Sequence, residues 1–288
     1  RHGPIGASRS GSSAGRSNLA DPRIVQRLIV IALTLLIAYL AVGVFFRAVQ
    51  ERFLFYPKEL PAHHVFSFDA PFDERFFDTP HDGRIHALHF RVERPKGVVL
   101  YSHGNADALD RWGELHPVFT RRGWDVLFYD YRGFGKSTGE RSEAAMHADV
   151  AAIYDALADE YGQDRIIVYG RSMGSGVSVP LAAARTPRHL ILETPYASIA
   201  DVARRFLPIW PVRRFLRYRF ESADVIDAVE CPIHILHGTD DTVVPYSSGQ
   251  KLFRACGPGA EMVTVVGGGH SDLADFPVYD EVMDEVLR

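Results

Sequence analysis

The sequence contains little cysteine and has no excess of positive charge. Its 288 residues include only two cysteines, Cys231 and Cys256, too few for a disulfide framework or a cysteine-based metal site. We expect them as two buried thiols or, alternatively, as one bridge. The formal net charge of −4 provides no general basic surface, which argues against nucleic-acid binding.

Internal repeats and a phosphate-binding loop are also missing. The run Gly267-Gly268-Gly269 precedes a histidine instead of the Lys-Ser/Thr pair that opens a helix in a phosphate loop. The pair His63-His64 has no further ligand at a spacing suited to a metal. We therefore predict neither a metal nor a cofactor. With 47% hydrophobic and 24% charged residues, the composition suits one globular domain with a sizeable core.

Charged residues are absent from Leu28 to Phe46, near the N-terminus. At about 1.5 Å per residue this stretch forms a helix of roughly 28 Å, close to the thickness of a bilayer core. The residues before it are rich in Gly, Ser and Arg. We predict a disordered tail over residues 1–23, a transmembrane helix over 24–50 and a globular domain over 51–288. A cleaved secretory signal, with Ala41-Val42-Gly43 as a weak cleavage site, and a buried core helix are the alternatives.

Basic residues on either side of this segment predict its orientation. Five arginines precede the apolar stretch and three basic residues follow it: Arg1, Arg9, Arg16, Arg23 and Arg27 against Arg47, Arg52 and Lys58. Because cytoplasmic loops carry more Lys and Arg, this modest difference places the N-terminus inside. The globular domain is then expected on the non-cytoplasmic side of the membrane.

A serine lies in a strand–turn–helix context in the middle of the chain. The β-branched run Arg165–Tyr169 leads into Gly170-Arg171-Ser172-Met173-Gly174, which small, helix-compatible residues follow. A Gly-x-Ser-x-Gly sequence in this setting presents the serine at a sharp turn, where side chains at the flanking positions would be crowded. The pattern predicts Ser172 as a nucleophile. The alternative is a serine that merely begins a helix.

A serine hydroxyl needs a base, and the base needs an orienting acid. Asp241 follows an apolar strand expected near residues 232–236, and His270 follows a last strand expected near 261–266. The chain order Ser, Asp, His is that of the α/β-hydrolases, and differs from the chymotrypsin and subtilisin orders. Asp240 competes with Asp241 for the role of the acid. His237 at a strand end is expected as a buried core histidine.

Donors for an oxyanion are expected on two loops. The backbone N–H of Met173, the residue after the nucleophile, is one. The other is the backbone N–H of Asn105, which follows the strand near 97–102 and the sequence Ser102-His103-Gly104. The Asn105 side chain is expected to add a donor or to cap the next helix. His103 is expected to be structural.

Several longer motifs carry a family resemblance. They are Phe55-Tyr56-Pro57, Ser102-His103-Gly104-Asn105-Ala106, Tyr129-Asp130-Tyr131-Arg132-Gly133-Phe134-Gly135-Lys136-Ser137, Gly170-Arg171-Ser172-Met173-Gly174, His237-Gly238-Thr239-Asp240-Asp241 with Val243-Val244-Pro245, and Gly269-His270. With these motifs the chain from about Arg52 resembles the α/β-hydrolase superfamily, within it the membrane-anchored serine hydrolases related to the fungal bud-emergence protein. The resemblance implies a Ser-His-Asp acyl hydrolase, whose members include esterases, thioesterases and lipid hydrolases.

The remaining pattern predicts the architecture. A hairpin is expected from 72–79 and 84–92, followed by strands near 97–102, 124–130, 165–169, 189–193, 232–236 and 261–266 that alternate with helices. This alternation indicates a mostly parallel, eight-stranded α/β-hydrolase sheet covered on both faces. The stripe Met146, Val150, Ile153, Leu157 and Tyr161 marks the buried face of one helix.

The least generic stretch covers residues 195–230 and is rich in arginine and aromatic residues. In this fold such an insertion is a candidate cap over the active site and a candidate contact for an acyl chain or the membrane surface, with Phe206 and Trp210 as its apolar contacts. The alternative is a solvated helix that packs on the sheet. We expect a small-molecule or lipid acyl substrate and contact with a bilayer, while protein partners stay unknown. A serine aminopeptidase, for which Glu221 and Asp224 could hold the amine, and a catalytically silent binding protein are the alternatives.

Overall fold

The computed structural model describes residue 3, residues 21–206 and residues 211–288. Most of the predicted tail over 1–23, and Trp210 of the cap, therefore lie outside the described residues. The chain divides into two units between Phe46 and Arg47, and each unit is described by itself. The domain boundaries expected from the sequence stay predictions.

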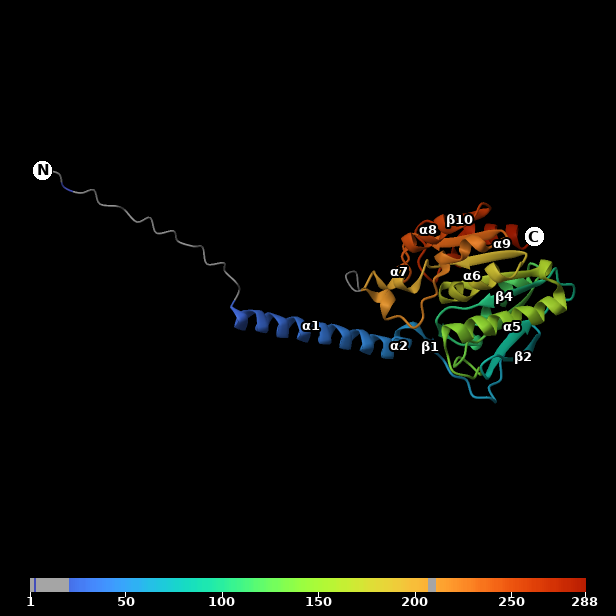
Figure 1. Cartoon of the computed structure of the whole chain (residues 1–288). Helices are drawn as coiled ribbons and strands as arrows, with labels where there is room; N and C mark the ends of the chain where they lie inside the picture. The colour runs from blue at the N-terminus through green and yellow to red at the C-terminus, as the bar shows by residue number, and fades with distance from the viewer. Residues whose placement is uncertain (1–2, 4–20, 207–210) are drawn as a thin grey trace. The chain divides into compact units, whose positions relative to one another are not determined.

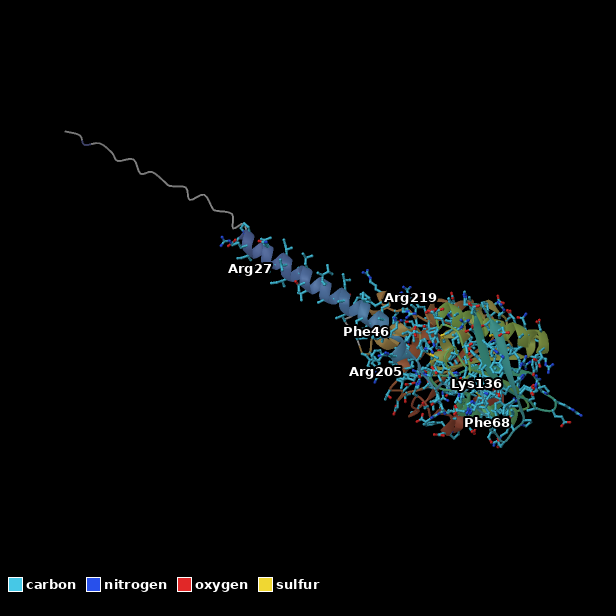
Figure 2. All side chains as sticks on the ribbon, turned by 90° about the horizontal axis from the view of Figure 1, so that it is seen from below. Arg27, Phe46, Phe68, Lys136, Arg205 and Arg219 are labelled. Carbon is cyan, nitrogen blue, oxygen red and sulfur yellow. The ribbon has the colours of Figure 1, made fainter. Side chains whose placement is uncertain are left out.

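The first long helix, α1, spans Pro22–Val49. It is long and apolar enough to cross a membrane by length and composition. Its apolar side chains are exposed, with Leu35 at 65% and Ile37 at 66% exposure, and those of Arg27 and Phe46 project from the helix (Figure 2). The alternative of a buried core helix is therefore wrong. A membrane anchor and a signal sequence both remain compatible with α1.

Within the described residues, eight strands form one sheet in the order β10-β9-β8-β7-β4-β6-β3-β2 (Figure 1). β2 pairs antiparallel with β3 and β3 with β6, while the other pairs are parallel. The strands are β2 Phe72–Thr79, β3 Gly83–Phe90, β4 Val98–Ser102, β6 Asp125–Tyr129, β7 Ile166–Arg171, β8 His189–Glu193, β9 Ile233–Gly238 and β10 Ala260–Val265. This confirms the expected fold, an eight-stranded, mostly parallel α/β-hydrolase sheet.

Alternate residues of the buried strands pack against helices on opposite faces of the sheet. On β4, Val98 and Leu100 join the core under α5, α6 and α8, whereas Val99 and Tyr101 join the core under α3, α4 and α9. The α-helices of this unit after α1 are α2 Glu51–Leu54, α3 Leu109–Trp112, α4 His116–Thr120, α5 Glu143–Tyr161, α6 Ser175–Ala184, α7 Ile199–Ala203, α8 Tyr246–Ala255 and α9 Pro277–Val286. The 3₁₀ turns are η1 Gly113–Leu115, η2 Gln163–Arg165, η3 Ser172–Gly174, η4 Val212–Arg214, η5 Ser222–Asp224, η6 Ile226–Ala228 and η7 Leu273–Asp275.

A two-stranded parallel pair was not anticipated from the sequence. β1 Tyr56–Pro57 pairs with β5 Ala106–Asp107, and the Tyr56 N–H donates to the Asn105 carbonyl at 2.8 Å. Strands of two residues carry no periodicity that a sequence pattern could reveal. The pair attaches the segment that follows α2 directly to the loop that carries Asn105.

A buried ion pair explains the arginine of the Tyr129–Ser137 motif. The Arg132 guanidinium donates to both carboxylate oxygens of Asp149, at 2.7 and 2.8 Å, and also to the carbonyls of Pro80 and His81. Both charged side chains are almost fully buried. Because Asp149 lies on α5 whereas Pro80 and His81 lie in the β2–β3 turn, Arg132 fastens this turn to α5.

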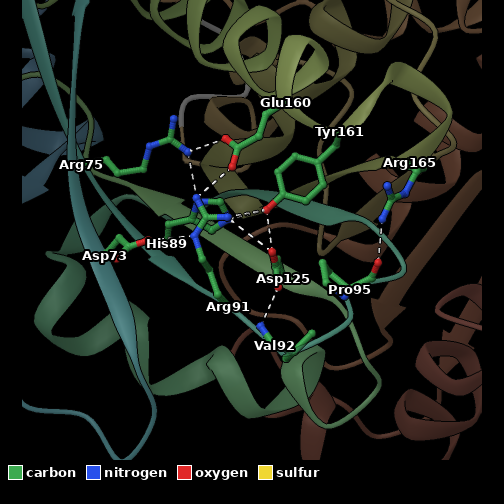
Figure 3. Close-up of polar contacts among 10 residues, drawn as sticks. All are labelled: Asp73, Arg75, His89, Arg91, Val92, Pro95, Asp125, Glu160, Tyr161 and Arg165. Atoms are coloured by element: carbon green, nitrogen blue, oxygen red, sulfur yellow. Dashed lines mark hydrogen bonds and ion pairs between the residues drawn. The ribbon is translucent and has the colours of Figure 1, made fainter.

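A second polar network closes the edge of the sheet where the parallel strands begin (Figure 3). The Tyr161 hydroxyl donates to Asp125 at 2.5 Å and accepts from His89 Nε2 at 3.1 Å, and Arg75 lies 3.0 Å from His89 Nδ1. Burial, together with the nearby charges of Arg91 and Arg75, lowers the pKa of His89 to about 3. A proton on His89 Nδ1 would place its N–H against the Arg75 guanidinium, so His89 is neutral and has a structural role.

Cys231 and Cys256 are free thiols. Cys231 is buried and Cys256 half-buried, and burial raises the pKa of each to about 11. The expectation of two thiols is therefore met, and the alternative of one bridge is wrong. Thiols with such pKa values are poor nucleophiles at neutral pH.

Candidate functional site

Ser172 sits at the turn between β7 and α6. Its φ of +51° lies in the left-handed region, a strained conformation for a residue with a side chain. A Cβ at Gly174 would lie 2.0 Å from the Ser102 carbonyl oxygen, and one at Gly170 would lie 2.7 Å from the Ser178 hydroxyl. The two glycines are thus required by close approach of the backbone, as the sequence pattern predicted.

The structure brings Ser172, His270 and Asp241 together. His270 Nε2 lies 2.9 Å from Ser172 Oγ, and His270 Nδ1 lies 2.8 Å from Asp241 Oδ2. A carboxylate can only accept, so Nδ1 carries the hydrogen and Nε2 accepts from the serine hydroxyl. The imidazole is thereby held in the tautomer that can remove a proton from Ser172.

Asp241 is buried and strongly hydrogen-bonded. Its Oδ1 accepts from the backbone N–H groups of Val243 and Val244, both at 2.8 Å, and its Oδ2 also lies 3.4 Å from His237 Nε2. Burial alone would raise the pKa of Asp241, but hydrogen bonds from His237, His270 and the backbone hold it well below its usual range. Asp241 is therefore an anion that can stabilise a positively charged His270.

The competing acid, Asp240, lies elsewhere. Its side chain is exposed and accepts from the Thr239 hydroxyl at 2.8 Å. The side chain that contacts His270 is that of Asp241. His237 is fully buried, as expected for a core histidine, and its Nε2 lies 3.1 Å from the Val244 carbonyl. Its contact with Asp241 was not foreseen, because position in a strand does not reveal which side chain a neighbouring loop brings near.

The two expected oxyanion donors flank the serine. Asn105 lines the cavity beside Ser172, and its backbone N–H donates to no other residue in the described part of the chain. Met173 occupies the first turn of η3, where N–H groups have no partner within the helix. The Asn105 side chain does not cap the next helix, since Ala108 holds the N-cap of α3.

Buried side chains hold the loop that carries Asn105 in place. His103 is fully buried, its Nδ1 lies 2.7 Å from the Gly104 carbonyl, and its own carbonyl accepts from the Tyr131 hydroxyl at 2.7 Å. His103 is therefore structural, as expected. Asp130 lies 3.5 Å from His103 Nε2 and is also buried, so the Tyr129–Ser137 motif supports this loop.

A cavity of about 340 Å³ opens beside the serine. It is lined by Gly104, Asn105, Ala106, Asp107, Arg111, Trp112, Leu115, Arg171, Ser172, His270 and Ser271. Five of these residues belong to none of the sequence motifs: Asp107, Arg111, Trp112, Leu115 and Ser271. Trp112 donates from Nε1 to the Ala106 carbonyl at 2.8 Å, and Arg171 lies over its ring; Arg111 is exposed at the rim. Short helices such as α3 give no periodic signal that would have identified them.

The predicted cap over residues 195–230 contains α7 and the turns η4, η5 and η6. The two acidic residues expected to hold a substrate amine, Glu221 and Asp224, both accept from Arg213, at 2.6 and 3.0 Å. Phe206 is 67% exposed. Among the described residues no group of three or more His, Cys, Asp or Glu side chains could hold a metal; that the protein needs none stays a prediction.

Comparison with known proteins identifies the family to which this fold belongs. The family described as serine aminopeptidase, S33, matches residues 93–225. An uncharacterized protein of Mycobacterium tuberculosis is 31% identical over 243 residues, which cover 82% of this chain and 86% of that protein. The α/β hydrolase domain-containing protein 17B of Xenopus tropicalis is 33% identical over 215 residues, 73% of each chain. An esterase structure from Pyrococcus furiosus is similar with a TM-score of 0.65 at 18% identity, covering 81% of this chain and 97% of that one. On this fold and these relatives, the chain belongs to the α/β-hydrolase family.

Proposed function

We propose that this protein is a serine hydrolase that cleaves ester or thioester bonds through an acyl-enzyme intermediate. The observation that carries the proposal is the continuous hydrogen-bonded chain from Ser172 through His270 to Asp241. Membership of the α/β-hydrolase family supports it, as does the fold shared with an esterase.

In the proposed acylation step, Ser172 Oγ attacks the carbonyl carbon of the substrate while His270 Nε2 takes the hydroxyl proton. Asp241 holds the imidazole and stabilises its positive charge. The tetrahedral intermediate places an oxyanion toward the backbone N–H groups of Asn105 and Met173, each contributing on the order of 3 kcal/mol. Collapse breaks the bond to the leaving group, and His270 returns the proton to the departing alcohol or thiol.

Deacylation reverses these roles with water as the nucleophile. His270 removes a proton from water as the oxygen attacks the acyl carbon, and the proton then returns to Ser172 Oγ as the acid is released. The strained φ of Ser172 and the close packing at Gly174 support this reading, because they fix the position of Ser172, which lines the cavity.

We place this chemistry at a membrane. The exposed, apolar α1 supports a role as an N-terminal anchor. The basic residues that flank α1 favour the non-cytoplasmic side for the hydrolase unit. Lipid or acylated molecules in the bilayer would then be substrates within reach.

Replacing Ser172 by alanine tests the proposal directly. Ser172→Ala should abolish labelling by a fluorophosphonate probe while the circular dichroism spectrum stays unchanged, because the substitution removes only the hydroxyl. Ser247→Ala, an exposed serine on α8, is the matched control and should label normally. Unchanged labelling of Ser172→Ala would remove this serine from the mechanism. Absence of labelling in the unaltered protein would favour the catalytically silent alternative.

A serine aminopeptidase is the second candidate, favoured by the description of the matching family. Against it, Glu221 and Asp224 are both engaged by Arg213, so they are not free to hold a substrate amine. Comparing kcat/KM for a peptide amide, a p-nitrophenyl ester and an acyl thioester separates the two candidates. Preference for the amide with a free N-terminus would favour the peptidase.

The exposed Phe206 allows a test of acyl contact by the cap; its expected companion Trp210 lies outside the described residues. Phe206→Ala should lower kcat/KM for long-chain esters more than for short-chain esters, since a longer chain has more apolar surface to bury. Val243, exposed on the loop after β9, provides the control Val243→Ala. Equal effects on both chain lengths would contradict acyl contact.

A further inference from the structure

A second cavity lies in the cap, outside the catalytic cavity. Its volume is about 470 Å³, and it is lined by Ala200, Arg204, Pro211, Val212, Arg213, Arg214 and Arg219. We call it the arginine pocket. It has four arginines among its lining residues and no acidic one, in a protein whose net charge is −4. The mechanism proposed above uses none of these residues.

The arginines differ in how far they are neutralised. Arg213 pairs with Glu221 and Asp224, and Arg204 reaches Asp201 only at 3.8 Å. Arg214 and Arg219 are exposed, and in the part of the chain that the structure describes neither guanidinium forms an ion pair with a carboxylate, although the backbone N–H of Arg219 donates to Glu143 at 2.5 Å. At least two positive charges are therefore available to an anion in the pocket. Guanidinium groups bind phosphate oxygens with paired, charge-assisted hydrogen bonds.

The cap is fastened to the chain where it leaves α1. The Gln50 side chain is buried, with Oε1 accepting from the Arg217 N–H at 2.8 Å and Nε2 donating to the Phe215 carbonyl at 3.4 Å. Arg47 also donates to the Leu216 carbonyl at 3.4 Å. In the sequence the tethered residues lie between the pocket residues Val212–Arg214 and Arg219, so residues 47 and 50 hold the segment that carries these pocket residues.

The surroundings of the pocket suit a lipid surface. Arg205 and Phe206 are exposed and follow Arg204 directly in the sequence. Arg205 and Arg219 project from one end of the hydrolase unit, away from Lys136 and Phe68 (Figure 2). An exposed aromatic ring beside several arginines is the combination expected where rings enter a bilayer interface and guanidinium groups meet headgroups.

We propose that the arginine pocket binds the phosphate of an anionic phospholipid headgroup in the bilayer that α1 enters. This inference rests on the proposed anchoring of α1, but not on the proposed catalysis. The headgroup phosphate lies between the guanidinium groups of Arg214 and Arg219, neither of which is ion-paired to a carboxylate among the described residues. The bound lipid would hold the cap against the membrane surface.

Binding to short-chain lipids tests the inference with the full chain in a neutral detergent. The Ser172→Ala protein is used so that no lipid is hydrolysed during the measurement. Isothermal titration compares dioctanoyl phosphatidylglycerol, dioctanoyl phosphatidylcholine and inorganic phosphate. We expect phosphatidylglycerol to bind more tightly than the other two. Adding Arg214→Gln and Arg219→Gln should weaken its binding by about 30-fold, the effect of two basic residues near a charged surface.

A matched control removes two arginines elsewhere. Arg121 and Arg188 are exposed and precede β6 and β8, so they lie at the opposite edge of the sheet from the cap. The double variant Arg121→Gln with Arg188→Gln should change the affinity for phosphatidylglycerol by less than about twofold. It loses as much positive charge as the double variant at Arg214 and Arg219, but salt screens the effect of these distant charges on the pocket.

Three results would overturn the inference. They are equal affinity for phosphatidylcholine and phosphatidylglycerol, equal losses in the two double variants, and inorganic phosphate binding as tightly as phosphatidylglycerol, which would indicate a site for a free phosphate. Fluorophosphonate labelling of the protein with Ser172 intact reports separately on the proposed function. Loss of labelling with lipid preference retained would reject the catalytic proposal and leave this one standing.

Discussion

Replacing Asp241 by asparagine should inactivate the protein through the orientation of one amide. The N–H groups of Val243 and Val244 both donate to Asp241 Oδ1, so the amide oxygen must occupy this position and the NH₂ group must take the place of Oδ2. That NH₂ group faces His270 Nδ1, which can then only accept. The hydrogen moves to Nε2, and the imidazole can no longer take the proton of Ser172.

The loss in kcat from the wrong tautomer is about 10⁴-fold, equivalent to roughly 5.5 kcal/mol of transition-state stabilisation. Hydrolysis of a p-nitrophenyl ester measures it, and the rate of fluorophosphonate labelling should fall in parallel. The adjacent Asp240→Asn carries the same change in charge at an exposed side chain that contacts Thr239, so its kcat should stay within about threefold of the unaltered protein, a difference of under 1 kcal/mol. A loss below tenfold in Asp241→Asn, or a larger loss in Asp240→Asn, would refute the reasoning.

Three further predictions concern stability. His89 binds a proton near pH 6.5 in the unfolded chain but only near pH 3 in the folded protein. The free energy of unfolding should therefore fall as the pH drops from 6.5 to 3, by up to about 1.4 kcal/mol per pH unit. Urea unfolding measured from pH 7 to pH 4 should show this slope, and His89→Gln should reduce it. Asp149→Ala leaves the buried Arg132 without its ion-pair partner and should lower the free energy of unfolding in urea by about 3–5 kcal/mol. The double variant Asp149→Leu with Arg132→Met should lower it by less, and equal losses in the two variants would contradict this reasoning. Gly174→Ala places a methyl group 2.0 Å from the Ser102 carbonyl oxygen. This variant should therefore have a lower melting temperature and should not be labelled by the fluorophosphonate probe. A normal melting temperature would show that the turn can move.

The main sheet could be predicted because each parallel strand is a short, apolar run followed by a turn. The hairpin over β2 and β3, the strand β4 and the strands β6 to β10 all lie within a few residues of their expected positions. Ser172, Asp241 and His270 were foreseeable for the same reason, since residues that follow parallel strands meet at one edge of the sheet. Their convergence is a consequence of topology.

Contacts between loops could not be predicted in this way. Nothing in the local sequence indicates that Tyr56 pairs with the Asn105 loop, or that His237 contacts the acid of the candidate triad. Arg171 and Trp112 meet because the end of β7 and α3 border the same cavity. Such contacts depend on the relative placement of short segments, which carry no hydrophobic period. The arginine pocket is another case, because a run of arginines does not reveal which of them acidic neighbours neutralise.

The burial of Gln50 decides where the chain can be shortened. A soluble fragment starting at residue 51, the first after the expected apolar helix, would delete the side chain that satisfies the Arg217 N–H and the Phe215 carbonyl. The loss of the acceptor of the Arg217 N–H favours local opening at this position. A fragment beginning at Arg47 keeps these bonds and removes most of the apolar surface. The fragment that begins at residue 51 should therefore be cleaved by protease near residue 215 more readily than the fragment that begins at Arg47. Activity measured with the shorter fragment would describe a protein whose cap lacks its hydrogen bonds to Gln50.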